Sequence, residues 1–266
     1  NYILTEMRTT GRDFSDVLKE AQEKGYAEAD PTFDVDGIDA AHKLSILCAL
    51  AFGVEIAFDA IDVSGIRTIT SKDIQFADEL GYRIKLVGIG KSKGGVIEQS
   101  LEPCLVPVSS ALGNVEGVFN AVCVEGDFID RSMLEGRGAG AGPTASAVVA
   151  DIIDIARGYS SPVLGVPAKD LKPRKPMPDK AIISGQFLHR VVRAQLGVFA
   201  DFTAILRDHA ISIESMLQRG RDPGQPVSVV IMTHDCSRAD IRAAAAKIGA
   251  LGSIVAKPTI LRVLPL

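Results

Sequence analysis

The stretch that decides the fold of the first part of the chain covers residues 25–44 and reads Gly-Tyr-Ala-Glu-Ala-Asp-Pro-Thr-Phe-Asp-Val-Asp-Gly-Ile-Asp-Ala-Ala-His-Lys-Leu. It opens on a glycine that can end a helix, crosses an acidic loop and enters a second helix. Five carboxylates fall within residues 28–39. Like charges this close are unfavourable unless cations neutralise them. The stretch therefore predicts a site for a cationic partner.

Helical patterns flank the acidic loop on both sides. Before it, Asp13 can cap a helix whose apolar residues recur at the 3.6-residue period, and Gly25 ends that helix. After it, a helix begins near Asp36 and ends at Gly53. Its apolar stripe consists of Ile38, Ala41, Leu44, Leu47 and Cys48. Asp39 and Lys43 are four residues apart, so their side chains are expected side by side on a neighbouring stripe.

Beyond this helix, the pattern changes to short β-rich runs at 83–88, 96–105 and 118–124. Their connections are too short for crossover helices, so they predict an antiparallel sheet. A helix is expected over 144–156. The region 160–179 contains five prolines among basic residues and predicts an extended linker.

The last part of the chain alternates strands and helices. Strands are expected over 181–192, 211–216, 227–233 and 259–264. One helix carries Val198, Phe202, Ile205 and Leu206, and the other begins at a capping box formed by residues 237–240. The order βαββαβ is that of a ferredoxin-like unit. The fold class is therefore α+β, with a mixed α/β part that contains a β-sheet, followed by this ferredoxin-like unit.

Composition excludes several classes of function. The chain is 47% hydrophobic and 23% charged, as in ordinary globular proteins. A net charge of -4 argues against nucleic-acid and anionic-membrane partners. No apolar run approaches the ~18 residues of a membrane span, and residues 1–6 lack the basic and apolar regions of a signal peptide, so we expect a cytoplasmic protein. The four cysteines are widely spaced, which predicts free thiols and no metal site.

The acidic stretch resembles a signature segment of homoserine dehydrogenases. The run Gly-Tyr-Ala-Glu-Ala-Asp-Pro and the later run Asp-Val-Asp-Gly-Ile-Asp-Ala-Ala-His-Lys-Leu are both similar to that family, as is Asn-Tyr-Ile-Leu-Thr at residues 1–5. The resemblance implies that Glu28 and Asp39 bind the amino group and hydroxyl region of the substrate, with Asp34 in support. It implies that Lys43 is the acid/base that moves the proton on the alcohol oxygen.

Physical chemistry agrees with these implied roles. A zwitterionic amino acid carries an ammonium group that carboxylates can hold. An aldehyde that accepts hydride develops negative charge on oxygen, and a protonated lysine can stabilise that charge and then neutralise it. Lys43 and Asp39 are therefore the expected catalytic residues. For an arbitrary pair at this spacing, the alternative is an ordinary surface ion pair.

A glycine-rich turn, Gly-Arg-Gly-Ala-Gly-Ala-Gly-Pro-Thr, occupies residues 136–144. Taken alone it is typical of a tight, packed turn, because it lacks the spacing of a dinucleotide fingerprint. It nevertheless looks like a second signature of the same family. The resemblance implies that Gly138 and Gly140 contact the nicotinamide end of NADP or NAD.

The βαββαβ unit resembles an ACT domain, a fold that often binds amino acids at the turn after its first strand. Gly197 occupies the usual glycine of that turn, although Ala-Gln-Leu precedes it where many ACT domains have Asp-x-Pro. Two roles stay open, an L-threonine effector site and a purely structural dimer-forming role. A homodimer or a homotetramer is expected.

The resemblance implies NAD(P)-dependent interconversion of L-homoserine and L-aspartate 4-semialdehyde, a step in threonine, methionine and isoleucine biosynthesis. Residues 1–160 would be the catalytic, substrate-binding and dimerisation domain, 161–179 the linker and 180–266 the ACT domain. No strand, phosphate loop and helix for a dinucleotide occur in the first part, and the chain opens inside apolar structure. We therefore expect that the nucleotide-binding domain is missing and that the chain alone is inactive. The alternative is a catalytically inactive amino-acid-binding or assembly module.

Overall fold

The computed structural model describes residues 1–25, 27–138, 140–193, 198–219, 226–252, 254–255 and 258–265. The chain begins with four helices, α1 (Tyr2–Thr10), α2 (Phe14–Glu23), the short α3 (Thr32–Val35) and α4 (Ile38–Phe52). Gly53 follows α4 in the left-handed conformation, with φ 62°, and its amide donates to the carbonyl of Ala49. The two helices expected around the acidic loop are thus confirmed, and α3 is an additional turn of helix inside that loop.

A sheet follows these helices. It contains β1 (Asp62–Val63), β2 (Tyr82–Lys93) and β3 (Val96–Pro107), and helix α5 (Ser71–Glu79) lies between β1 and β2. The strands β2 and β3 form an antiparallel hairpin across the two-residue turn Gly94-Gly95. Both glycines have positive φ, 58° and 79°, as two-residue hairpin turns of this kind require. The antiparallel pairing expected for this region is therefore present.

The third β-rich run does not join that sheet. Strand β4 (Phe119–Gly126) pairs antiparallel with β5 (Asp130–Arg137) in a separate two-stranded sheet. The expectation of one sheet through residue 124 was wrong, because a tight turn at residues 127–129 brings β5 back onto β4 at once. The side chains of β5 are mostly exposed, so no inward-facing alternation marked it as a strand. Helix α6 (Ala141–Ala156) comes next and begins three residues earlier than expected.

The proline-rich region crosses the molecule as an extended segment and contains one short turn, η3 (Ala168–Asp170). It also pairs with the first part of the chain. The amide of Lys172 donates to the carbonyl of Gly53 at 3.0 Å, and the amide of Met177 donates to the carbonyl of Ile97 at 2.9 Å. The segment is thus extended, as predicted, and is held by backbone hydrogen bonds at two places.

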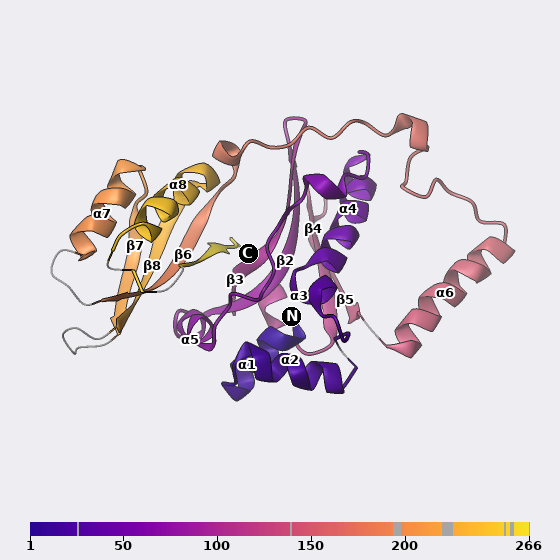
Figure 1. The fold of residues 1–266 in the computed structure, drawn as a ribbon. Coiled ribbons are helices and arrows are strands. Elements are labelled where there is room, and N and C mark those ends of the chain that lie inside the picture. Colours follow the sequence, from indigo (N-terminus) through magenta and orange to yellow (C-terminus); the bar gives the residue numbers. More distant parts are fainter. Residues whose placement is uncertain are drawn as a thin grey trace.

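The last part contains β6 (Ile183–Arg193), α7 (Val198–Asp208), β7 (Ile213–Arg219), β8 (Pro226–Ser237), α8 (Arg238–Gly249) and β9 (Thr259–Val263). The strands lie in the order β9-β6-β8-β7, which confirms the ferredoxin-like unit. Helices α7 and α8 cover one face of this sheet (Figure 1). The Ser237 hydroxyl caps α8 by accepting from the amide of Asp240 at 3.1 Å. The expected capping box is half formed, because the Asp240 carboxylate bonds the Ser237 hydroxyl rather than a backbone amide.

The sheets of the two parts are continuous. Strand β9 pairs parallel with β3 through Cys104↔Arg262 and Leu105↔Val263, which gives one seven-stranded sheet. The face of the last four strands that α7 and α8 leave open packs on the first part of the chain. Its Phe187, Val230 and Leu261 share a hydrophobic cluster with Met7 and Phe76. No helix in the described ranges is long and apolar enough to span a bilayer.

Candidate active site

The centre of the candidate site is an ion pair on the first two turns of α4. The Lys43 Nζ atom lies 2.6 Å from the Asp39 Oδ2 atom. The Lys43 side chain is 61% exposed and the Asp39 side chain 50% exposed. Their expected position side by side on one helix face is thus present. An ammonium group held by a carboxylate and open to solvent can both bind a negative oxygen and exchange a proton with it.

The acidic loop brings further carboxylates to the start of α4. Asp34 lies on α3, and Glu28 lies just before it, where the Gln22 amide holds the backbone by donating to the Glu28 carbonyl at 3.0 Å. Both side chains are exposed. Within the described part of the chain, neither carboxylate has a hydrogen-bond or ion-pair partner. These are the groups that remain available to a cationic ligand.

Two other carboxylates of the loop have partners. The Asp36 Oδ1 atom accepts from the Arg67 Nε atom at 2.6 Å, and this hydrogen bond raises the pKa of Arg67. Asp30 accepts from the amide of Thr32 at 3.1 Å. Hydrogen bonds from Thr32 lower the pKa of Asp30. Of these two carboxylates, only Asp36 is neutralised, because its partner Arg67 is a cation. Asp30 keeps its negative charge, because Thr32 is uncharged.

Sequence reasoning missed Arg67, which contacts the acidic loop from another part of the chain. It lies 31 residues beyond Asp36, in the segment between β1 and α5, and only the tertiary fold brings it to the loop. The Ile66 amide in the same segment donates to the Val35 carbonyl at 2.9 Å. No local pattern around Arg67 distinguishes it from other surface arginines.

Two glycines hold the loop close to the sheet. Gly37 precedes α4 with φ 84°, and a Cβ atom there would lie 2.6 Å from the Leu101 Cδ2 atom of β3. A Cβ atom on Gly65 would lie 2.5 Å from the Asp36 Cα atom, nearer than real Cβ contacts occur. The backbone at Gly65 thus touches the backbone at Asp36 directly, an approach that only glycine permits. This contact sets the height of α3 and α4 above the sheet.

The glycine-rich turn lies at the junction of β5 and α6. Gly138 donates to the Val118 carbonyl at 3.2 Å, and a Cβ atom there would overlap the Asn120 side-chain amide. Gly140 has φ 113° and precedes α6, whose first turn is free of acidic residues. No side chain caps this helix, so its small residues leave backbone amides accessible. These features fit a contact with one end of a dinucleotide.

The described residues do not contain the strand, glycine turn and helix that hold a pyrophosphate in a dinucleotide fold. Their parallel strand pairs are β1 with β3 and β3 with β9, and neither pair is joined by that unit. The described residues therefore contain no complete dinucleotide site. Gly197, the residue expected to contact an effector, lies outside the described residues.

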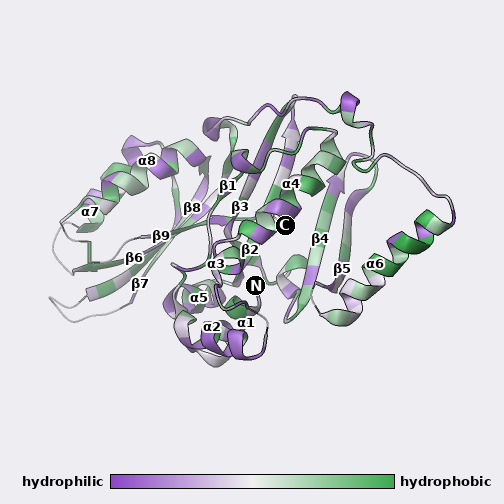
Figure 2. Ribbon diagram, turned by 45° about the vertical axis from the view of Figure 1, so that its right-hand side comes forward, coloured by the Kyte–Doolittle hydropathy of each residue, from purple (hydrophilic) through white to green (hydrophobic). Residues whose placement is uncertain are grey.

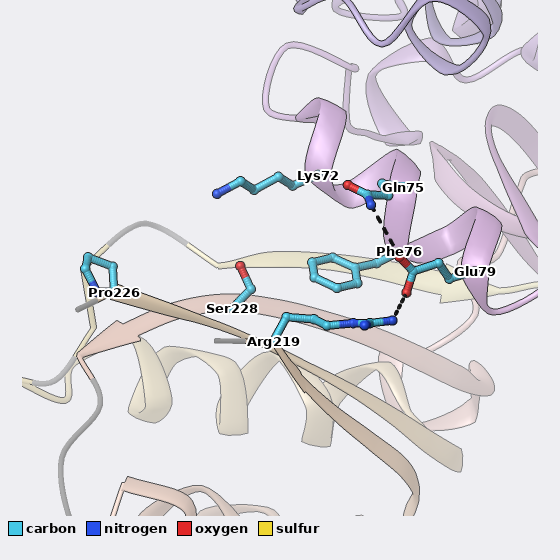
Figure 3. Close-up of a pocket in the computed structure, with 7 residues that line it drawn as sticks. All are labelled: Lys72, Gln75, Phe76, Glu79, Arg219, Pro226 and Ser228. Carbon is cyan, nitrogen blue, oxygen red and sulfur yellow. Dashed lines mark hydrogen bonds and ion pairs between the residues drawn. The ribbon is translucent and has the colours of Figure 1, made fainter. Parts of the chain in front are cut away.

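A cavity of about 380 Å³ lies between α5 and the strands β7 and β8 (Figure 3). On its rim, the Glu79 carboxylate accepts from Arg219 at 2.8 Å and from the Gln75 amide at 3.3 Å. Phe76 and Ser228 line the same space. No residue of the acidic loop or α4 lines it. The candidate site is therefore the open surface around Lys43 and not this cavity.

The histidines have structural surroundings. His189 is buried, and its Nδ1 atom lies 2.6 Å from the Asp73 Oδ1 atom. The other carboxylate oxygen of Asp73 accepts from the Thr259 hydroxyl at 3.3 Å. This cluster joins α5 to β6 and β9. His42 stacks on Phe58.

Comparison with known proteins assigns both parts of the chain. The family model for homoserine dehydrogenase matches residues 1–153, and the model for the ACT domain matches residues 191–253. A homoserine dehydrogenase from Neisseria gonorrhoeae is 43% identical, over 98% of this chain and 62% of its own length. One from Pseudomonas aeruginosa is 42% identical, over 96% of this chain and 60% of its own.

Solved structures agree with these sequence matches. The crystal structure of a homoserine dehydrogenase from Thiobacillus denitrificans superposes with a TM-score of 0.89 at 43% identity, over 99% of this chain and 61% of that one. The Staphylococcus aureus homoserine dehydrogenase at pH 6.0 gives a TM-score of 0.72 at 31% identity, over 100% of this chain and 63% of that one. The chain thus spans about three fifths of the length of the relatives it matches. With its first 153 residues matched by the family model, this chain belongs to the homoserine dehydrogenase family.

Proposed function

We propose that the surface around Lys43 is the substrate half of a site that interconverts L-homoserine and L-aspartate 4-semialdehyde with NADP or NAD. One observation carries the proposal. An exposed lysine pairs with a carboxylate at 2.6 Å, next to a loop that keeps two carboxylates unpaired. Because the relatives are longer than this chain, the activity is proposed for the protein that contains these 266 residues.

The unpaired carboxylates suit the substrate's ammonium group. L-homoserine and the semialdehyde are both zwitterionic amino acids, and their ammonium groups would neutralise Glu28 and Asp34. Asp39 would bind near the hydroxyl or aldehyde end, because it lies beside Lys43 on α4. Several carboxylates around one ammonium group orient the substrate as well as bind it.

Lys43 would move the proton. In the direction of reduction, negative charge grows on the aldehyde oxygen, and the Lys43 ammonium group stabilises that charge and donates its proton to the oxygen. In the direction of oxidation, the neutral amine accepts the proton of the alcohol. Asp39 orients the lysine side chain in both directions. The nicotinamide cofactor, when bound, supplies or accepts the hydride, and Gly138 and Gly140 would contact its nicotinamide end.

Replacing Lys43 tests this function. We expect Lys43→Ala to lower kcat for homoserine oxidation by about 10²- to 10⁴-fold, the usual contribution of a general acid or base. Nicotinamide absorbance measures the rate. Lys91→Ala, on the exposed β2–β3 hairpin, is the matched control and should keep the activity of the unaltered protein. Turnover of Lys43→Ala near the unaltered rate, with the same pH profile, would refute the assignment. The alternative of an inactive binding module requires that the unaltered protein has no turnover.

The exposed apolar surface supports a proposal about assembly. Helix α6 has no buried residue, and Figure 2 shows the green of hydrophobic residues along it and along β4 and β5. The exposed set includes Val148, Val149, Ile152, Ile155 and Leu134. Surface of this kind is typical of interfaces, and a homodimer or homotetramer would cover part of it. Light scattering of the purified protein would show a monomer if this is wrong.

Regulation by L-threonine and the division of the chain at residues 160 and 180 are also proposed. The ACT match supports the first, and the extended proline-rich segment supports the second. Calorimetry with millimolar L-threonine tests the effector, and the absence of heat from folded protein would refute it. A cytoplasmic location is proposed as well, and it is consistent with four free cysteines.

A further inference from the structure

Three aromatic rings form a stack beside the candidate site. Phe33 lies on α3, His42 on α4, and Phe58 on the short turn η1 (Phe58–Ala60). The His42 and Phe58 ring centroids are 4.0 Å apart with an interplanar angle of 5°. The Phe33 and His42 centroids are 6.3 Å apart with an angle of 7°. All three rings are thus nearly parallel, although they come from three separate elements.

Each of the first two rings is a direct neighbour of a site residue. Phe33 immediately precedes Asp34, and His42 immediately precedes Lys43. Only Asp36 and Gly37 connect α3 to α4, and Gly37 has φ 84°. The angle between the helix with Asp34 and the helix with Lys43 thus depends on a two-residue joint. The stack bridges that joint from outside.

Phe58 is half-buried against the cluster that contains Ala41 and Leu44, but burial does not explain the positions of the other two rings. Phe33 is 55% exposed, and His42 is exposed as well. Exposed rings gain little from transfer out of water, so their parallel alignment reflects contact between ring faces. Within the described residues, the His42 ring has no hydrogen bond. The ring contacts Phe33 and Phe58 through its two faces.

We propose that the Phe33, His42 and Phe58 stack is a positioning device that sets the distance between Asp34 and the Lys43–Asp39 pair, with His42 as its central positioning residue. This inference rests on the proposed function. The ring at position 42 matters for its flat shape and not for its titration. A phenylalanine at the same position therefore preserves the device, and a small side chain removes it.

The test compares His42→Ala with His42→Phe in the protein that contains this chain. We expect His42→Ala to lower kcat/KM for homoserine by about ten- to one hundred-fold, the range that small misplacements of a site produce. The KM for homoserine should rise while the KM for the cofactor stays unchanged. His42→Phe should restore most of the activity, and the pH profile should be the same in all three proteins because Lys43 is retained.

Matched controls separate positioning from general damage. His234→Ala removes an exposed histidine from β8 and should leave every kinetic constant unchanged. Phe33→Ala should reproduce the rise in the KM for homoserine, whereas Phe128→Ala, at a side chain that is 98% exposed in the β4–β5 turn, should not. If His42→Ala does not fold, Phe33→Ala carries the same comparison.

Two results would overturn the inference. His42→Ala with unchanged kcat/KM would show that the stack positions nothing, and His42→Phe as impaired as His42→Ala would show that the imidazole itself is needed. Both results leave the proposed function intact. An unaltered protein without homoserine-dependent turnover would instead refute the proposed function and the positioning role with it.

Discussion

Two charged regions of the molecule differ in how they treat their carboxylates. In the acidic loop, Glu28 and Asp34 are exposed, and neither carboxylate has an ion-pair partner among the residues that the structure describes. At the junction of β3, β9 and α8, Glu98 is buried and bonded by two arginines, Arg262 and Arg238, the second at 3.1 Å. Arg238 also lies 3.3 Å from Glu102. The carboxylates of the loop thus remain available to a ligand, whereas those of the junction are paired with arginines within the fold.

The difference shows how burial separates binding from structure. A buried carboxylate is stable only when its hydrogen-bonding capacity is satisfied, so the junction cannot release Glu98 to a ligand. An exposed carboxylate is hydrated and contributes little to the stability of the fold. It can therefore bind the ammonium group of a ligand without loss of stability. Substitutions at the junction should therefore lower the free energy of unfolding, and substitutions in the loop should weaken substrate binding.

The largest expected effect on stability is at Glu98. Glu98→Ala leaves Arg262 buried with only Glu102 nearby, at 3.6 Å. Removing one partner of a buried pair destabilises by about 3–5 kcal/mol, and denaturant unfolding measures this loss. Glu125→Ala breaks an exposed pair with Arg131 and is the control, with a loss of at most about 1 kcal/mol. Equal losses in the two variants would remove the contrast between the regions.

Gly65→Ala should lower the stability of the protein and weaken substrate binding. The new methyl group must push away the backbone at Asp36, and overpacking of this kind typically costs about 1–3 kcal/mol. The KM for homoserine should rise because the loop moves away from the sheet. Gly136→Ala is the control, since a Cβ atom there meets nothing within 4 Å. A Gly65→Ala protein with unchanged stability and KM would show that the close backbone contact is not important.

Arg67→Ala should change the substrate constants more than the stability. Its ion pair with Asp36 is about 40% exposed on each side, 43% and 38%, and exposed pairs contribute about 0–1 kcal/mol. We expect a higher KM for homoserine because the pair fixes the acidic loop. Arg131→Ala breaks a comparable exposed pair on the β4–β5 hairpin and should leave the KM unchanged. A loss of stability as large as that of Glu98→Ala would contradict the comparison.

The smallest expected effect concerns acid sensitivity at Asp30. Hydrogen bonds from Thr32 hold the pKa of Asp30 below its ordinary value of 3.8. A lowered carboxylate pKa stabilises the fold above the unfolded-state pKa, and this contribution is lost as the pH falls through the folded-state pKa. Asp30→Asn should therefore lower Tm slightly at pH 7 and leave it unchanged near pH 2. A Tm difference that grows towards low pH would have the wrong sign.

Sequence patterns predicted the local features and missed those that depend on distant segments. The spacing of Asp39 and Lys43, the stop at Gly53 and the order of strands in the last part all follow from periodicity and turn residues. Arg67, the buried Glu98 cluster and the pairing of β9 with β3 join residues far apart in the chain. Nothing in a local window indicates which distant arginine will reach which carboxylate. Strand β5 was missed because its residues are exposed on both faces.

The pairing of β3 with β9 has a consequence for anyone who shortens the chain. Removing residues 180–266 would leave β3 with an open edge beside Leu105, together with the uncovered apolar surface that now packs on Phe187 and Leu261. An exposed edge strand next to apolar surface is a template for aggregation. Deleting residues 180–266 is therefore expected to yield an aggregating protein rather than a soluble one that contains residues 1–179.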